Sequence, residues 1–415
     1  MNVGGKHFET TRSTLTAALT VAPASYFGSM SDGFSKGRMQ RDGEGRVFID
    51  RNGAMFEYIL DFLRRYSSSD KNADFAIRAL PKIQMEAMRK ELTYYGLESA
   101  VFPPAPFRID VATFKQGSDM LSERGGLGAV ILPDNRGVLV VGGKDNDWEY
   151  LASTELFDLD SETFSPGPEM GSRRNGCAAA VLEDGQVLVV GGTDGPDTLS
   201  TTEVLSPASN TWSFGPNMTS TRVGCAAVPL STNKILIIGG KRDFSSMAAL
   251  SYLSTTEIVD LASGISTPGP AMSCPRYCCS AVILQDGRVL VIGGGSNLES
   301  SLSTTEVIDL TSRTSSPGPE MTTARLGAAA VLLPEEGGVL VIGGEKIVGT
   351  DLATTEVLDV AGNTSSAGPM LGTPRSYCAA VKLPGDHILV TGGYSHGFPI
   401  YISEKLGMPA EEGQQ

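Results

Sequence analysis

The sequence has few of the features that membrane proteins and secreted proteins need. No apolar run approaches the ~20 residues that a membrane-spanning helix requires, and the longest, such as 137–143, are the size of a strand. The N-terminus has no basic segment followed by an apolar core, so a secretory signal is not expected. We therefore predict a cytoplasmic protein, with the nucleus as the alternative, and no membrane partner.

Positive charge is scarce in most of the chain. Residues 1–106 contain 14 Lys and Arg and 12 Asp and Glu, whereas the remaining residues contain 19 and 35. An acidic surface repels the phosphate backbone, and the near-neutral first part has no basic run. No nucleic-acid partner is therefore expected.

Histidine is also scarce, and cysteine is scattered. His387 opens a predicted strand and His396 lies in the loop at the opposite rim, so the two do not form a copper centre. Cys274 and Cys278 lack partners at zinc spacing. No nucleophile elbow, phosphate loop or metal-binding helix motif occurs. We expect no metal, no cofactor and no enzymatic activity.

What the sequence does contain is a repeat. Glycine pairs recur at spacings of 49, 48, 54, 50 and 49 residues, and each follows a short apolar run that predicts a buried strand. The pairs begin at Gly142, Gly191, Gly239, Gly293, Gly343 and Gly392. An Arg precedes each pair by 17 or 18 residues: Arg124, Arg174, Arg222, Arg276, Arg325 and Arg375. A Glu follows each pair after a loop: Glu155, Glu203, Glu257, Glu306, Glu356 and Glu404.

Each unit holds about four strands, with turns such as Asp184-Gly185 between the first two. Four-stranded antiparallel units of this length are typical of propeller blades. The double glycine, the period and the strand order resemble the kelch repeat across about 295 residues. Kelch units usually carry a Trp in the fourth strand, where this sequence has Trp212, with Phe164 and Phe114 as substitutes. The sixth unit ends after its third strand, so residues 112–118 are predicted to supply its fourth.

The first hundred residues have a different pattern. Residues 2–15 predict two strands joined by a glycine turn, and residues 47–51 a third strand leading into a helix with Phe56, Ile59 and Leu63 on one face. The motifs Asn2-Val3-Gly4-Gly5, Ser25-Tyr26-Phe27 and Tyr94-Tyr95-Gly96-Leu97 resemble the BTB domain of the potassium-channel tetramerisation type. That resemblance implies tetramers or pentamers, and often recruitment of a cullin ubiquitin ligase.

These patterns predict an α/β BTB domain followed by an all-β six-bladed kelch propeller. The expected limits are 1–101 for the BTB/POZ domain, 102–111 for a stiff Pro-rich linker, 112–407 for the propeller and 408–415 for a disordered tail. No helical domain separates BTB from kelch, unlike in the common BTB–kelch ligase adaptors.

The six arginines are candidates for a partner-binding ring, because Arg pairs bidentately with carboxylates of an acidic peptide. The alternative is that each Arg pairs with the repeated Glu and holds the blades together. The cysteines three residues after four of these arginines (Cys177, Cys225, Cys279 and Cys378) are predicted to be buried small strand residues.

The loops after the glycine pairs differ between units, and such loops usually carry binding specificity. Their candidate partner contacts are Trp148, Tyr150, Arg242, Phe244, Tyr252, His396 and Phe398, and the longest loop is 241–254. Aromatic and Arg side chains are common interface anchors. The alternative for the aromatic residues is simple packing onto the rim.

The predicted function is a homo-oligomerising protein-interaction scaffold, in which BTB assembles subunits and kelch binds a protein partner. A cullin-ligase substrate adaptor is the specialised form. The alternatives are a carbohydrate-acting propeller enzyme, for which catalytic residues are missing, and an auxiliary subunit of a channel or receptor through mixed BTB assembly.

Overall fold

The chain divides into two compact units, Met1–Pro106 and Phe107–Gln415. The computed structural model describes only part of the first unit. In the second it describes residues 112–407, with gaps at 134–135, 207–208, 231–232, 244–250, 297–300, 334–337 and 348. The predicted linker at 102–111 and tail at 408–415 lie outside the described residues.

Three short strands are described in the first unit. β1 (Asn2–Val3) pairs antiparallel with β2 (Lys6–His7) and parallel with β3 (Phe48–Ile49), in the order β2-β1-β3. Phe56 and Ile59 are helical and fully buried, as the predicted apolar face requires. The described residues of this unit therefore agree with the predicted strands and helix, and the predicted turn at residues 4–5 lies outside them.

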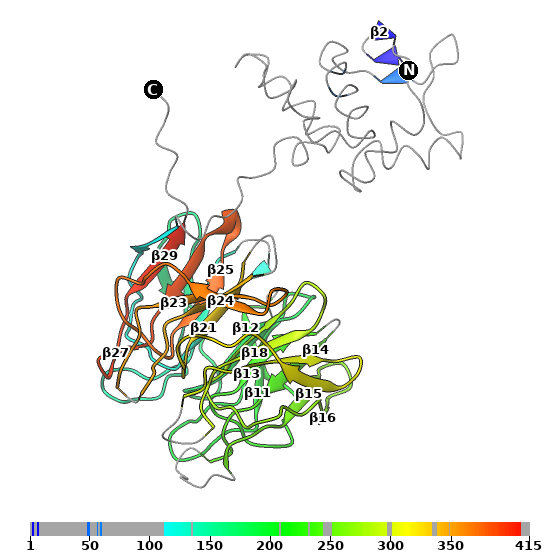
Figure 1. The fold of residues 1–415 in the computed structure, drawn as a ribbon. Coiled ribbons are helices and arrows are strands. Elements are labelled where there is room, and N and C mark those ends of the chain that lie inside the picture. Colours follow the sequence, from blue (N-terminus) through cyan, green and yellow to red (C-terminus); the bar gives the residue numbers. More distant parts are fainter. Residues whose placement is uncertain are drawn as a thin grey trace. The chain divides into compact units, whose positions relative to one another are not determined.

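The second unit is a β-propeller of six four-stranded antiparallel sheets (Figure 1). Blade 1 contains β5 (Gly128–Ile131), β6 (Val138–Val141), β7 (Thr154–Phe157) and β8 (Phe164–Pro166). Blade 2 contains β9 (Ala178–Val181), β10 (Val187–Val190), β11 (Thr202–Ser206) and β12 (Thr211–Phe214). Blade 3 contains β13 (Ala226–Pro229), β14 (Lys234–Ile238), β15 (Thr256–Asp260) and β16 (Ile265–Pro268).

The remaining blades repeat this order. Blade 4 contains β17 (Ser280–Ile283), β18 (Val289–Ile292), β19 (Thr305–Asp309) and β20 (Thr314–Pro317). Blade 5 contains β21 (Ala329–Leu332), β22 (Gly338–Ile342), β23 (Thr355–Asp359) and β24 (Thr364–Ala367). Blade 6 contains β25 (Ala379–Lys382), β26 (Ile388–Thr391), β29 (Ser403–Gly407) and β4 (Thr113–Gln116), with a 3-10 turn, η3 (Pro384–Asp386), and a small hairpin of β27 (Tyr394–Ser395) and β28 (Phe398–Pro399).

The second strand of each blade is the most deeply buried. In β6, β10, β18 and β26 all four residues are buried, because neighbouring blades cover both faces of the sheet. Each of these strands ends at a glycine pair with positive φ. At Gly142 (φ 62) an added Cβ would lie 2.3 Å from the carbonyl oxygen of Arg174 in the next unit, so a side chain has no room there.

The ring closes through its two ends, as predicted. β4 pairs antiparallel with β29, with Phe114 opposite Leu406 and Thr113 opposite Gly407. In Figure 1 the red strand β29 therefore lies beside a strand from the cyan start of the propeller. The first strands of the blades also contact one another around the whole ring, including β25 with β5. Closure pairs the outer edge of β29, which would otherwise be open.

The fourth strands explain the missing kelch tryptophans. Trp212 and Phe164 occupy this position in blades 2 and 1, and Phe114 occupies it in blade 6. Blades 3, 4 and 5 carry serine instead. There Ser266, Ser315 and Ser365 donate hydrogen bonds of 2.7–2.8 Å to the repeated Glu of the same blade. The serines therefore replace apolar packing by a hydrogen bond to a buried carboxylate.

Candidate functional site

The repeated arginines join each blade to the one before it. The main chain of Arg174 is held by blade 1, since its N–H donates to Leu151 O (3.0 Å) and its carbonyl accepts from Gly143 N–H (2.8 Å). Its guanidinium reaches blade 2, where it donates to Gly191 O (2.8 Å) and Glu203 Oε1 (3.0 Å). The other five arginines make the same connections, and Arg124 joins blade 6 to blade 1.

These arginines are closed to solvent. All six are at most 2% exposed, and each lies 2.6–3.0 Å from the Glu of its own blade. Burial lowers the pKa of Arg124 and Arg325, and the neighbouring Glu opposes that effect in each case. Of the two predicted roles, this geometry favours the structural one, because the donors are directed to groups inside the propeller.

A second ring surrounds the central channel, two residues after each arginine. Its members donate main-chain N–H groups around a closed circle, with N···O distances of 2.6–3.1 Å: Gly126, Gly176, Gly224, Cys278, Gly327 and Tyr377. All six have positive φ, which is ordinary for the glycines but uncommon for Cys278 (φ 50) and Tyr377 (φ 49). The ring borders a small cavity of about 100 Å³.

Tyrosines cover one side of this channel mouth. A Cβ at Gly224 would lie 2.5 Å from the ring of Tyr277, and one at Gly125 would lie 2.2 Å from the ring of Tyr394, so each tyrosine rests on a glycine. Tyr377 packs edge-on against Tyr394 and donates to Glu345 Oε1 (2.5 Å). Burial raises the pKa of Tyr394 to about 12.

The tyrosine cluster was predicted only in part, because Tyr252 was among the predicted site residues but Tyr277 and Tyr377 were not. Its signal was present in the sequence, since Cys278 and Tyr377 stand where the other units have glycine. These departures from glycine become visible when the six similar units are aligned with one another. The cluster gives the rim an asymmetry that the repeated Arg and Glu do not.

Trp148 and Tyr150 lie in the loop of blade 1 after its glycine pair. Trp148 has positive φ (64) at a turn, and its side chain is 55% exposed. The ammonium of Lys144 lies 4.5 Å from the Trp148 ring centroid and 4.7 Å from that of Tyr150. Such cation–π contacts orient the two rings, so the loop presents a fixed aromatic surface.

His396 and Phe398 lie in the hairpin of blade 6. His396 and Gly397 form its turn, and both have positive φ. The His396 N–H donates to the carboxylate of Asp351 (2.7 Å) in the loop of blade 5. Phe398 is 64% exposed. The hairpin is therefore fixed to its neighbour while its aromatic side chain stays accessible.

Two of the three predicted contacts in the loop at 241–254 lie among the described residues. Arg242 is exposed, but its main chain is held by Ser251 O and by the hydroxyl of Thr221. Tyr252 is 6% exposed and packs against Tyr277 and Lys241. Phe244 lies outside the described residues. Tyr252 thus packs onto the rim, because its ring completes the tyrosine cluster.

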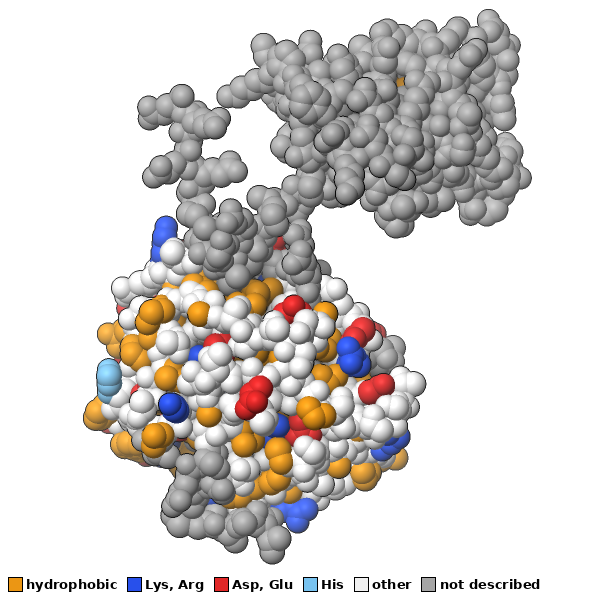
Figure 2. Space-filling model, in the orientation of Figure 1, with side chains coloured by type: hydrophobic (Ala, Val, Ile, Leu, Met, Phe, Trp, Pro, Cys, Tyr) orange, Lys and Arg blue, Asp and Glu red, His pale blue; other side chains and the backbone are white. Residues whose placement is uncertain are grey.

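Exposed apolar side chains gather on the same rim, in blades 1, 5 and 6. Among the described residues eight large apolar side chains are exposed, and Phe214 and Ile265 lie on the fourth strands of blades 2 and 3. The other six belong to the rim segments around the glycine pairs: Leu121, Trp148, Ile347, Met370, Phe398 and Tyr401. We call these six the rim patch. On the face that Figure 2 shows, hydrophobic side chains are spread over the propeller with a few charged ones between them.

Comparison with known proteins agrees with this architecture. A BTB/POZ domain family model matches residues 1–103, and a kelch motif model matches residues 173–219 and 275–322. The human BTB/POZ domain-containing protein KCTD21 is 38% identical over 101 residues, which are 24% of this chain and 34% of that protein. The mouse potassium channel regulatory protein is 36% identical over 101 residues, covering 24% and 33% of the two chains.

The chain thus spans about a third of the length of these relatives, and the match is confined to the first domain. It combines a BTB/POZ domain of the potassium-channel tetramerisation type with a kelch propeller. Together the two domains imply an oligomerising scaffold for protein interactions. In the described part of the chain, no helix has the length and composition to cross a bilayer, and no three His, Cys, Asp or Glu side chains gather in a metal-binding group.

Proposed function

We propose that the protein is a homo-oligomerising scaffold whose propeller binds a protein partner at the rim patch. The observation that carries the proposal is that six of the eight exposed large apolar side chains among the described residues lie on rim segments of blades 1, 5 and 6. Large apolar side chains that stay exposed on a folded protein are candidates for interaction sites. Trp148 and Phe398 are the aromatic anchors of the rim patch, because large rings bury much area at low entropic cost.

The geometry of the patch supports binding without rearrangement. Trp148 is held by the cation–π contact with Lys144, and the hairpin that carries Phe398 is held by Asp351. Side chains that are already ordered lose little entropy on association. Several copies joined by the BTB domain would then bind a multivalent partner more tightly than one copy alone.

A paired-variant binding experiment tests this function. Full-length chain with Trp148→Ala and Phe398→Ala is compared with a Phe214→Ala, Ile265→Ala chain, in which equally exposed side chains are removed from blades 2 and 3. Proteins retained from a cell lysate are quantified by mass spectrometry. We expect one set of proteins to be lost from the first variant and kept by the second. Equal retention by both variants would contradict the rim patch as the partner surface.

Oligomerisation is tested on the full chain by light scattering. The BTB resemblance leads us to propose a tetramer or a pentamer, so the scattering mass should be four or five times that of one chain. A monomer at micromolar concentration would contradict the scaffold proposal.

A cullin-ligase adaptor is the specialised form of this function. It predicts that a cullin co-purifies with the full chain and that its retention depends on the first domain and not on Trp148 or Phe398. The similarity to the mouse potassium channel regulatory protein favours one further candidate, regulation of a potassium channel through mixed BTB assembly. In that case a channel subunit, and no cullin, would co-purify through the first domain.

A further inference from the structure

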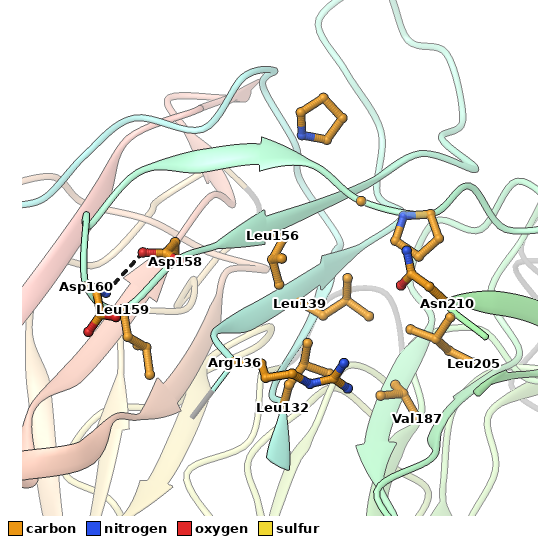
Figure 3. A pocket seen from close by; sticks show the side chains of 13 residues that line it. Leu132, Arg136, Leu139, Leu156, Asp158, Leu159, Asp160, Val187, Leu205 and Asn210 are labelled. Carbon is orange, nitrogen blue, oxygen red and sulfur yellow. Dashed lines mark hydrogen bonds between the residues drawn. The ribbon is translucent and has the colours of Figure 1, made fainter. Parts of the chain in front are cut away.

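A separate pocket of about 430 Å³ lies between blades 1 and 2 (Figure 3). Buried apolar side chains line its floor, from blade 1 (Leu132 and Leu139) and from blade 2 (Val187 and Leu205). Leu156, half-buried on β7, points into the space from the wall. The volume is within the range of ~300–1,000 Å³ that ligand pockets occupy.

The mouth of the pocket carries charge. Asp158 and Asp160 form one side of it, in the turn after β7, and Arg136 and Asn210 lie across the opening. The carboxylate of Asp158 accepts from Ser161 N–H (2.8 Å) and Asp160 N–H (3.1 Å), and these hydrogen bonds lower its pKa. Both aspartates are exposed.

The mouth of the pocket and the rim patch lie at opposite ends of the blade strands. Arg136 precedes β6 and Asp158 follows β7, so the mouth is at the end of these strands opposite to the glycine pair. The two blades are held together beside it by Trp212, whose Nε1 donates to Pro168 O of blade 1 (2.9 Å). The space is therefore preformed between two fixed walls.

We propose that this pocket binds a peptide segment of a partner protein that carries a leucine-sized apolar side chain flanked by lysine or arginine. The apolar side chain would fill the space above Leu139 and Leu205. The flanking cations would face Asp158 and Asp160. Charge complementarity favours this occupant, because two carboxylates and one guanidinium line the pocket and residues 107–415 contain 35 acidic but only 19 basic side chains.

The test uses the full chain and a labelled probe peptide. The probe is a capped, fluorescein-labelled hexapeptide with one leucine flanked by lysines, and binding is followed by fluorescence anisotropy. Two comparison peptides carry serine in place of leucine or glutamates in place of lysines. We expect saturable binding of the first peptide and at least tenfold weaker binding of the other two.

The chain offers a matched pair of pocket variants. Leu156→Lys places a long cationic side chain in the pocket, and the fold accepts lysine at this position because Lys405 occupies it in blade 6. Ile258→Lys makes the same change at the same position of blade 3, away from the pocket. We expect Leu156→Lys to weaken binding at least tenfold and Ile258→Lys to change it less than twofold.

A charge reversal tests the mouth. Asp160→Lys should weaken binding severalfold and reduce its dependence on salt, since one ion pair becomes a repulsion. The proposal is overturned if the lysine–leucine peptide does not bind saturably, if the glutamate peptide binds equally well, or if Leu156→Lys behaves like Ile258→Lys. The Trp148→Ala, Phe398→Ala chain should bind the probe normally, so failure here is distinct from failure of the rim patch.

Discussion

Ser315 donates a hydrogen bond of 2.7 Å from its Oγ to Glu306 Oε2, across the third and fourth strands of blade 4. The other carboxylate oxygen accepts from Arg276 Nε (3.0 Å), which holds blade 3 to blade 4. A serine in place of the usual kelch tryptophan therefore holds the carboxylate that binds the arginine of the preceding blade. This relationship makes the stability of the propeller sensitive to single polar atoms.

Removal of that hydroxyl should destabilise the chain. We expect Ser315→Ala to lower the free energy of unfolding by about 1–2 kcal/mol, because a buried carboxylate loses a hydrogen bond without gaining water. Urea unfolding monitored by circular dichroism measures the change. The neighbouring Ser316→Ala is the control, since Ser316 is exposed and should cost less than about 0.5 kcal/mol. Equal effects of the two changes would contradict the assigned contact.

An arginine that joins two blades should contribute more to the stability of the fold than an exposed arginine. Arg276→Ala leaves Glu306 buried without its cation and should cost about 3–5 kcal/mol. Arg288→Ala breaks an ion pair with Asp286 that is similarly short (2.7 Å), but both partners are nearly half exposed, so the stability should change little. Thermal melts of both variants provide the comparison. A partner-binding role for the arginine ring would instead predict normal melting of Arg276→Ala with lost binding.

Acid should weaken this contact in a defined range. Burial disfavours the charged form of Glu306, but hydrogen bonds from Ser273 N–H and Ser315 and the charge of Arg276 outweigh it, so the pKa falls to about 2. An unfolded Glu has a pKa of about 4.3. Because the folded pKa is the lower one, the stabilisation is complete above about pH 5 and is lost as the pH falls toward 2.

This pH dependence is measurable in the serine variant. The difference in urea midpoint between the native chain and Ser315→Ala should be largest at pH 6 and should shrink below about pH 3. A difference that stays constant from pH 6 to pH 2.5 would show that Ser315 does not act through an ionised Glu306.

The strand that closes the ring gives a further prediction. Deletion of residues 112–118 removes β4 and exposes the edge of β29, which is open to pairing with other molecules. We expect the shortened chain to aggregate, as measured by light scattering, and a synthetic peptide of residues 108–120 to reduce the aggregation. A shortened chain that melts at the native temperature would show that closure does not stabilise the ring.

The cysteines after the arginines should be unreactive. Burial raises the pKa of Cys177, Cys279 and Cys378 to about 11 and that of Cys225 to about 12, so thiolate is scarce at pH 8. Iodoacetamide followed by peptide mapping should modify half-buried Cys274 before any of these four. The urea-unfolded chain, in which all six should react, is the control. Rapid folded-state labelling of Cys225 would contradict its burial.

Much of the propeller could be predicted because its units repeat. Six Arg, six Glu and six glycine pairs in step define the blades, and the missing fourth strand after Gly407 identifies its replacement around Phe114. The partner of Ser315 could not be predicted, because a serine in a strand is usually interpreted as an exposed polar residue. Only the structure shows that Glu306 on the paired strand accepts its hydrogen bond.

The candidate sites were less predictable for a related reason. Loop aromatic residues can be found in the sequence, but their exposure depends on neighbours from other blades. Trp148 and Tyr252 follow glycine pairs in equivalent loops, yet one is exposed and the other is covered by the Tyr277 cluster. The pocket between blades 1 and 2 depends on Leu139 and Leu205, which are separated by a complete unit, so no local pattern indicates it.

The pairing of Thr113 with Gly407 has a mechanical consequence. The chain enters the propeller at Thr113 and leaves it at Gly407, at the same end of the same two strands. Tension applied between the first domain and the C-terminus would therefore open β4 from β29 one residue pair at a time, as a zipper opens. Tension between the first domain and a partner bound at the rim patch would not pull on the C-terminus, so it would load other contacts between the blades. The direction of a pull, and not only its strength, would decide whether the ring stays closed.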